Sequence, residues 1–231
     1  MSWLRHELLD GVGVDHGFGT RGCRPPERML RPRQVHGAHV LVISRGAPPP
    51  PAAGAALGEA DALVSDAPGV PIGVVTADCV PILLATPSGC VAAVHAGWRG
   101  LAAGVIGSAV DALAGLAPDA SDAVAAIGPR IGRGCYEVDA PVVDALAGPC
   151  GAALDAALLA TRPGHWQVDL AHLAVHLLRR AGLAATRIAA LEGACTACDP
   201  ERFHSFRRDG PNAGRLFHFA VARGDPPAPR S

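Results

Sequence analysis

The sequence predicts an α/β protein of the α+β type, a single domain in which mixed β-sheets are flanked by helices. The chain has 231 residues, of which 49% are hydrophobic, so it can bury one sizeable core. Short apolar runs that close on Asp, Pro or Gly are typical of buried strands, and longer periodic or Ala-rich segments are typical of helices. The two kinds do not alternate strictly, which favours a mixed sheet. We expect the domain to cover residues 1–223 and residues 224–231 (GDPPAPRS) to be a disordered tail.

The expected strands are short runs of apolar and β-branched residues between turn residues. They cover residues 12–20, 34–44, 60–66, 71–78, 81–87, 90–97, 124–129, 187–194 and 215–222. The four runs between residues 60 and 97 are expected to lie in one sheet. The Pro- and Ala-rich segment 48–60 is expected to be a surface loop.

Helices are expected over residues 101–116, 139–146 and 169–183. In the last of these an apolar stripe recurs at helical spacing, Asp169 can cap the start and Gly182 can end the helix. Asp139 is a candidate cap for the second helix. Gly104 and Gly107 weaken the first helix by about 1 kcal/mol each relative to Ala.

The composition excludes several classes of chemistry. All 20 basic residues are Arg, so a Schiff-base lysine and a Walker A loop are impossible. The net charge of −1 predicts no nucleic-acid or membrane partner. The first residues (MSWLRHE) lack an apolar signal core and no window is long enough to span a membrane, so we expect a cytoplasmic protein. Seven cysteines without the density of a disulfide scaffold indicate free thiols or metal ligation.

Three apolar runs end in a turn that carries a metal-competent residue: His36 in QVHG, Cys79 in TADC and His95 in VHAGWRG. Each of them alone would more often be a structural side chain. Together they sit where rigid strands project side chains into loops. Two imidazoles and one thiolate suit Zn²⁺, and three protein ligands leave a fourth position open. We therefore predict a zinc site at these three residues, with copper as a chemically easy substitute.

Two other patterns have simpler interpretations. Cys195 and Cys198 form a CxxC without the second pair of a zinc ribbon, which favours two reduced thiols in a turn. His172 and His176 share one face of a helix, but Leu173 stands where the HExxH motif needs Glu. We interpret that face as solvent-exposed.

Several blocks, in the same order along nearly the whole chain, resemble one bacterial family. It has been labelled laccase domain or polyphenol oxidase and is also described as purine nucleoside phosphorylase. The blocks are HGFGTR (16–21), QVHG (34–37), ADALVSD (60–66), TADCVPILL (76–84), VHAGWRG (94–100), IGPRIGRGCYEV (127–138) and CTACDPERFHSFRRDG (195–210). In that family the His of QVHG, the Cys of TADC and the His of HAGWRG bind a catalytic zinc. Carried across, these are His36, Cys79 and His95.

The resemblance implies an enzyme acting on purine nucleosides and inorganic phosphate. Adenosine, inosine and S-methyl-5′-thioadenosine would be cleaved to the free base and (methylthio)ribose 1-phosphate, and adenosine would also be deaminated. Arginines in the matching blocks are candidates for a phosphate site because guanidinium binds phosphate through paired N–H groups; they are Arg21, Arg99, Arg207 and Arg208.

Two further residues of the matching blocks have two interpretations each. Gln34 is either a substrate-binding donor or a turn residue. Asp78, beside the catalytic candidate Cys79, is either a functional group, as a catalytic proton acceptor or an anchor that supports the metal site, or a turn residue. The chain departs from the family after HGFGTR, where residues 22–26 (GCRPP) replace a Gly-Gly-Val-Ser type turn.

The sequence leaves three rival functions to consider. Copper-dependent oxidation of phenols is disfavoured, because the ten histidines include no His-x-His pair. Editing of peptidoglycan precursors would use Cys79 and His95 as a nucleophilic pair, and metal content separates this chemistry from a zinc enzyme. A non-catalytic binding module predicts no turnover. The sequence determines neither the preferred nucleoside nor the oligomeric state.

Overall fold

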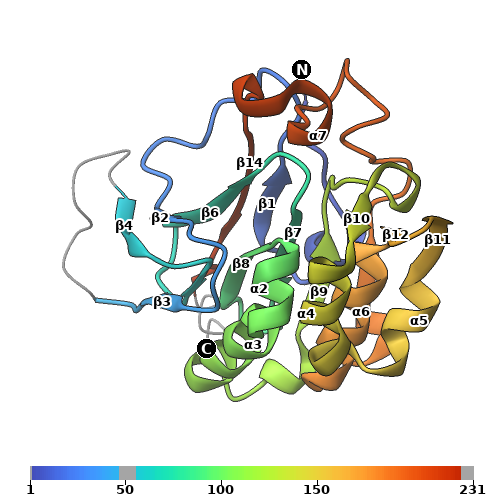
Figure 1. Cartoon of the computed structure of the whole chain (residues 1–231). Coiled ribbons are helices and arrows are strands. Elements are labelled where there is room, and N and C mark those ends of the chain that lie inside the picture. The colour runs from blue at the N-terminus through green and yellow to red at the C-terminus, as the bar shows by residue number, and fades with distance from the viewer. Residues whose placement is uncertain (1, 47–55, 225–231) are drawn as a thin grey trace, which may run out of the picture.

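A six-stranded mixed sheet lies at the centre of the computed structural model, which describes residues 2–46 and 56–224 (Figure 1). Its strands, in spatial order, are β13 (Ile188–Ala190), β9 (Val124–Ile127), β7 (Val80–Ala85), β8 (Val91–Ala96), β5 (Ala62–Ser65) and β3 (Val40–Ile43). The outer pairs β13–β9 and β3–β5 are parallel, and the inner pairs are antiparallel. The mixed α/β domain predicted from the sequence is confirmed.

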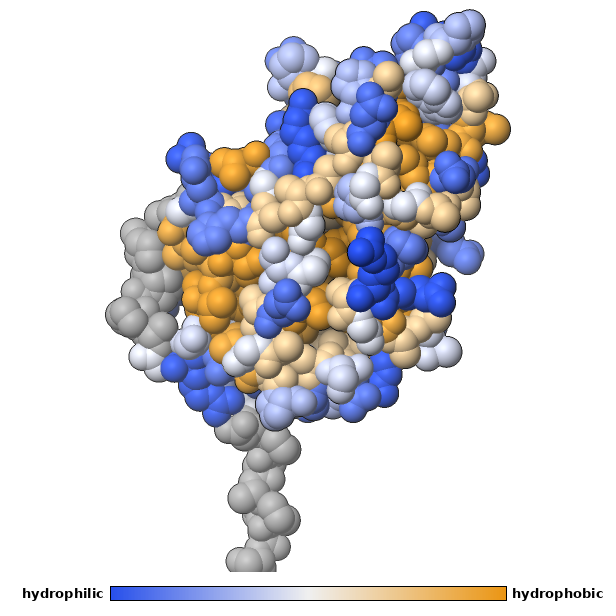
Figure 2. Space-filling model, turned by 60° about the horizontal axis from the view of Figure 1, so that its bottom comes forward, coloured by the Kyte–Doolittle hydropathy of each residue, from blue (hydrophilic) through white to orange (hydrophobic). Residues whose placement is uncertain are grey.

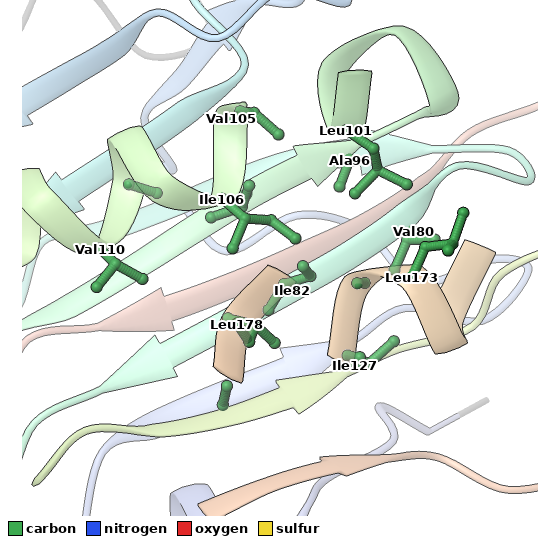
Figure 3. Packing of buried hydrophobic residues seen from close by; sticks show 14 of the residues in the cluster. Val80, Ile82, Ala96, Leu101, Val105, Ile106, Val110, Ile127, Leu173 and Leu178 are labelled. Atoms are coloured by element: carbon green, nitrogen blue, oxygen red, sulfur yellow. The ribbon is translucent and has the colours of Figure 1, made fainter. Parts of the chain in front are cut away.

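Helices cover one face of this sheet. They are α2 (Trp98–Ala103), α3 (Val105–Leu116), α4 (Ala140–Cys150), α5 (Ala152–Ala157) and α6 (Leu170–Arg180). Figure 3 shows Ile106 of α3 and Leu178 of α6 packing over Ile82 of β7, and all three belong to the larger of the buried apolar clusters. Asp169 accepts a hydrogen bond from the backbone N–H of His172 at 3.0 Å, so the predicted cap of α6 is confirmed.

A second, three-stranded sheet covers the opposite face. Its strands are β1 (Asp15–Phe18), β14 (Leu216–Val221) and β6 (Pro71–Thr76), all antiparallel, and α1 (Glu7–Gly11) adds Leu9 to the same layer. Leu83 of β7 packs toward this side, whereas its neighbours Ile82 and Leu84 pack toward the helices. All six residues of β7 are buried because both faces of the central sheet are covered.

The prediction that the four runs between residues 60 and 97 share one sheet is wrong for one of them. Residues 71–76 form β6 in the three-stranded sheet, while the other three runs form β5, β7 and β8. The chain crosses between layers at the turn that contains Asp78, whose φ is +95°. Hydropathy is alike in both layers, so the apolar runs alone did not distinguish them.

Short peripheral strands complete the fold, and the sequence analysis missed them. They are β2 (Arg31–Arg33), which pairs with β4 (Ala56–Glu59), and β10 (Glu137–Asp139), β12 (His165–Val168) and β11 (Leu158–Arg162), which form a small sheet. These strands are only three to five residues long, and none contains a run of buried apolar residues that would mark it. The loop expected over residues 48–60 is therefore corrected at residues 56–59, and its residues 48–55 lie outside the described ones.

Two more boundaries differ from expectation. The strand expected over residues 34–44 begins only at Val40, and the residues before it form a loop in which His36 has a φ of +61°. The helix expected over residues 101–116 is divided into α2 and α3 at Gly104, whose φ of +89° is left-handed and interrupts the helix. The division lets α2 begin at Trp98, directly after the loop that follows β8.

The remaining elements lie around this framework. Helix α7 (Phe206–Asp209) lies at the upper end in Figure 1, and 3₁₀ turns are found at Ala120–Asp122, Arg133–Cys135, Ala185–Arg187 and Gly210–Asn212. Within residues 2–46 and 56–224, the structure contains no helix with the length and apolar character of a membrane span. The face seen in Figure 2 carries apolar areas separated by hydrophilic side chains. Of the expected tail 224–231, residues 225–231 lie outside the described ones.

Candidate metal centre

Antiparallel pairing of β7 with β8 brings Cys79 next to His95. Val80 at the start of β7 lies opposite Ala96 at the end of β8, and Pro81 lies opposite His95. Cys79 immediately precedes β7, so its side chain emerges at the edge of the sheet where β8 ends. Residues that are 16 positions apart in the sequence are neighbours because the strand pairing fixes their register.

A buried carboxylate delivers the third side chain. Asp61 accepts hydrogen bonds from the backbone N–H groups of Val35 at 3.2 Å, His36 at 2.9 Å and Gly37 at 2.6 Å. Its Oδ1 also lies 2.7 Å from Nδ1 of His95, and its side chain is fully buried. Asp61 thus joins the loop that carries His36 to the strand that carries His95.

His36, Cys79 and His95 form a compact donor group, whose ligand atoms all lie within 4.8 Å of one another. The two imidazole rings meet edge to face with centroids 4.8 Å apart. A Cβ atom at Gly97 would lie 2.9 Å from Sγ of Cys79 and 3.2 Å from Cδ2 of His36. Glycine at position 97 is therefore required for these side chains to come this close.

The pKa values of Cys79 and His95 are shifted by their neighbours in this group. Burial alone would raise the pKa of the Cys79 thiol, but hydrogen bonds with His36 and His95 outweigh it and lower that pKa to about 6. Burial would lower the pKa of His95, but its hydrogen bonds with Asp61 and Cys79 raise it to about 9. The group therefore favours a thiolate, the form of cysteine that binds metal ions.

Asp78 holds the turn before Cys79 in place. Its Oδ1 accepts from the hydroxyl of Thr196 at 2.5 Å, and its Oδ2 accepts from the backbone N–H of Arg207 at 2.6 Å. Its own carbonyl accepts from the N–H of Ile131 at 2.9 Å. The carboxylate thus ties the metal-site turn to the C-terminal segment, and the same contacts stabilise the positive φ of this residue.

The donor group lines a cavity of about 630 Å³, a size typical of small-molecule sites. Aromatic side chains line it, namely Trp98, Tyr136 and Phe206, together with the arginines Arg31, Arg33, Arg99, Arg207 and Arg215. Burial raises the pKa of the Tyr136 phenol to about 12, so the group keeps its proton at neutral pH.

The candidate binding residues from the sequence occupy different positions relative to this cavity. Arg99 and Arg207 line it, and their guanidinium groups lie 4.1 Å from the Trp98 ring centroid and 4.9 Å from that of Tyr136. Gln34 also lines the cavity, but its side-chain amide is engaged by the backbone of Val75. Its Oε1 accepts from the N–H of Val75 at 2.8 Å, and its Nε2 donates to the carbonyl of Val75 at 2.7 Å.

Arg21 and Arg208 are not among the lining residues. The guanidinium of Arg21 donates to the carbonyl of Pro200. That of Arg208 donates to the carbonyls of Thr196 and Phe203 at 2.8 and 2.9 Å and pairs with Asp209.

Sequence reasoning missed Asp61, Thr196 and Tyr136. Asp61 had a signal: a carboxylate stands directly before the fully buried run that forms β5. A charge at such a position is expected to have partners, because an unpaired buried carboxylate is costly. Thr196 and Tyr136 had no local signal, since each reaches the site only through the packing of distant segments.

The fold and the donor group place this chain among α/β proteins that have a candidate metal centre of histidine and cysteine ligands at the ends of paired strands. Within that class, the chain belongs to the multi-copper polyphenol oxidoreductase laccase family, whose model matches residues 19–223.

Relatives of this chain carry other names. Purine nucleoside phosphorylase from Xylella fastidiosa (strain 9a5c) is 44% identical over 186 residues, which cover 77% of this chain and 66% of the relative, just under two thirds of its length. Adenosine deaminase RL5, from an unknown prokaryotic organism, is 35% identical over 192 residues, covering 82% and 73%. The crystal structure of YlmD from Geobacillus stearothermophilus superposes with a TM-score of 0.84 at 31% identity and covers 97% of both chains.

Proposed function

We propose that this chain is a zinc-dependent purine nucleoside phosphorylase that also deaminates adenosine. Its substrates would be adenosine, inosine and S-methyl-5′-thioadenosine, with inorganic phosphate as the co-substrate. The observation that carries the proposal is the close group of His36, Cys79 and His95 in a cavity lined by arginines and aromatic residues. The names of the relatives, purine nucleoside phosphorylase and adenosine deaminase, support the same chemistry.

The donor group fits a zinc ion. Two imidazole nitrogens and one thiolate are ligands that zinc prefers, and they leave one coordination position free. Asp61 engages Nδ1 of His95, which leaves Nε2 as the nitrogen available to a metal and fixes the orientation of the ring. When bound, the ion would supply a Lewis acid with an open coordination position.

Arginines of the cavity are the groups we assign to phosphate. In the part of the chain that the structure describes, the guanidinium groups of Arg31 and Arg99 have no hydrogen bond or ion pair, so both are available to a ligand. A phosphate oxygen must bond to C1′ as the C1′–N9 bond breaks, and the leaving purine takes up a proton. Guanidinium groups orient the attacking anion and bind it through paired N–H donors.

Aromatic residues of the cavity are the groups we assign to the nucleoside. Trp98 and Phe206 offer ring faces on which a purine can stack. Tyr136, which retains its phenolic proton, offers a hydrogen-bond donor beside them. These residues would hold the base while the arginines hold the phosphate.

The test is chromatography of adenosine incubated with metal-quantified protein, with and without phosphate. We expect adenine and ribose 1-phosphate only with phosphate, and inosine in both samples. His36→Ala is expected to lose zinc and turnover together, whereas His39→Ala, at another exposed histidine outside the donor group, should keep both. Absence of any product from fully zinc-loaded protein would refute the proposal. Turnover by the metal-free protein would instead favour Cys79 and His95 as a nucleophilic pair.

The role of Arg99 has its own test. Arg99→Met is expected to raise KM for phosphate by roughly 10- to 100-fold, because a hydrogen bond to a charged group contributes about 1.5–3 kcal/mol. KM for the nucleoside should change much less. Arg179→Met removes an exposed arginine that does not line the cavity and should leave both constants unchanged. An unchanged KM for phosphate in Arg99→Met would remove Arg99 from the phosphate site.

A further inference from the structure

Three cysteines meet outside the cavity described above. Cys135 ends a 3₁₀ turn, and Cys195 and Cys198 lie in the loop that follows β13. Their sulfur atoms all lie within 4.8 Å of one another, and those of Cys135 and Cys198 are 3.1 Å apart. Two segments separated by 60 residues thus supply one group of thiols.

The backbone around Cys195 is arranged to hold its sulfur in place. Arg130 and Cys195 form an isolated parallel bridge, with the N–H of Arg130 donating to Ala194 at 3.2 Å and that of Thr196 donating to Arg130 at 3.0 Å. This bridge joins the two segments on which the three cysteines lie.

Backbone N–H groups converge on the sulfur of Cys195. The N–H of Gly132 donates a hydrogen bond to Sγ at 3.1 Å, and the N–H groups of Ala197 and Cys198 also donate to this sulfur. A Cβ at position 132 would lie 3.1 Å from the same sulfur, so glycine permits the approach. Several N–H donors around one sulfur favour the negatively charged thiolate, the form in which cysteine binds metal ions.

The number and spacing of the sulfurs fit a metal ion better than a disulfide. Zinc–sulfur bonds of about 2.3 Å with tetrahedral angles place ligand sulfurs about 3.8 Å apart. The sulfurs of Cys135 and Cys198, now 3.1 Å apart, would have to move apart only slightly to reach this separation. The other sulfur pairs lie within 4.8 Å and would have to approach one another only slightly. A disulfide, with an S–S bond of about 2.05 Å, would use two of the sulfurs and leave the third without a role.

We infer that Cys135, Cys195 and Cys198 form a second metal site, which binds a thiophilic ion such as Zn²⁺ through three thiolates. Cys198 is exposed, so the ion can enter from solvent and its fourth coordination position is filled by water. The site is separate from the group of His36, Cys79 and His95 and shares no ligand with it.

This second ion would stabilise one wall of the cavity. Tyr136, which lines the cavity, follows Cys135 directly, and Arg207 donates to the carbonyl of Glu137 at 2.9 Å. Thr196, inside the CxxC turn, donates to the carboxylate of Asp78. Crosslinking the two segments through a metal ion therefore restrains residues that line the cavity, without contact between the ion and the substrate.

The test counts metal ions by mass spectrometry after zinc loading and removal of weakly bound zinc. Wild-type protein is expected to hold two zinc ions per chain, and Cys198→Ser and His95→Ala one each. Cys23→Ser is the matched control at a cysteine outside both groups and should hold two. Cys198→Ser that retains two ions would overturn the inference. If only the His95 variant retains two, the three-cysteine site stands and the zinc site of the proposed function fails.

Two further measurements do not depend on a cysteine variant that folds. Cobalt bound to the His95→Ala variant should show strong sulfur-to-metal charge-transfer absorption, because three thiolates remain. Its absence would contradict the inference. Unreduced protein denatured in a chelator should titrate as seven thiols; a count of five would reveal a disulfide and would likewise overturn it.

Discussion

Asp61 joins the loop that carries His36 to the strand that carries His95 through one carboxylate. Its two oxygens accept from three consecutive backbone N–H groups around His36, and one of them also faces the ring of His95. Because the carboxylate is fully buried, each of these contacts offsets part of the cost of removing its charge from water. The same contacts select which ring nitrogen of His95 is free.

Replacing Asp61 with Asn should therefore weaken metal binding. The amide NH₂ group cannot accept, so it would face backbone N–H donors and leave them unsatisfied. We expect a loss of about 10- to 100-fold in zinc affinity, typical of substitutions at a hydrogen-bonded partner of a ligand. Competition with a chromophoric chelator measures this, with Asp144→Asn at an exposed helix position as the control. Unchanged affinity in Asp61→Asn would show that the loop holds His36 without the carboxylate.

Gly97 sets the space available to two of the ligands. Gly97→Ala would place a methyl group 2.9 Å from Sγ of Cys79 and 3.2 Å from the ring of His36. We expect zinc binding to fall by at least tenfold while the circular dichroism spectrum is retained, because the clash is confined to the ligands. Gly107→Ala, where a Cβ meets nothing within 4 Å, is the matched control. Full zinc occupancy in Gly97→Ala would contradict this account.

At the scale of elements, the break between α2 and α3 positions the cavity wall. The left-handed Gly104 ends α2 with its N–H bonded to the carbonyls of Gly100 and Leu101, and α3 begins at the next residue, Val105. Trp98 and Arg99 occupy the first turn of α2 and both line the cavity. A continuous helix over this region would not need the conformation that Gly104 adopts.

Gly104 and Gly107 lie three residues apart, and their replacement with alanine should change the stability in opposite directions. Gly104→Ala forces a side chain into a left-handed conformation and should cost about 1–3 kcal/mol of unfolding free energy. Gly107→Ala, inside α3 where an added Cβ meets no atom within 4 Å, should add about 0.5–1 kcal/mol of unfolding free energy. Urea denaturation measures the unfolding free energy of both variants. Equal effects of the same sign would show that the φ of Gly104 is not a structural requirement.

At the scale of the whole molecule, the three-stranded sheet buries a histidine that remains neutral. His218 of β14 is fully buried against Phe18, and its Nε2 lies 2.8 Å from the hydroxyl of Thr76. Burial lowers the pKa of His218 to about 3. Unfolding exposes the ring and returns its pKa to about 6.5, so the unfolded chain binds a proton that the folded protein excludes.

Acid should therefore destabilise the protein through this histidine. The stabilisation is complete above about pH 6.5 and is lost as the pH falls toward 3, with a slope of about 1.4 kcal/mol per pH unit between those limits. His218→Gln, which keeps a polar partner for Thr76, should remove the contribution of this one proton, about 1.4 kcal/mol per pH unit, from the slope. Denaturation curves between pH 6 and 4 test this, with exposed His172→Gln as the control. An unchanged slope in His218→Gln would mean that other groups cause the acid sensitivity.

Prediction from sequence succeeded where the signal was local. The apolar runs that became β5, β7, β8 and β9 and the periodic stripe of α6 were identified because each pattern lies within a few consecutive residues. The peripheral strands were missed because they are only three to five residues long and contain no run of buried apolar residues. The assignment of β6 to the wrong sheet has a related cause, since a buried strand has the same hydropathy in either layer.

The sequence by itself determined the α/β class, the strongest strands and helices, and the identity of three metal-competent side chains at the ends of apolar runs. Tertiary structure decided which groups lie beside them. Asp61 reaches His95 through the pairing of β5 with β8, and Cys135 reaches Cys198 through a bridge between distant segments. The physical reason is that strand register and loop packing depend on contacts between residues far apart in the chain, which no local pattern specifies.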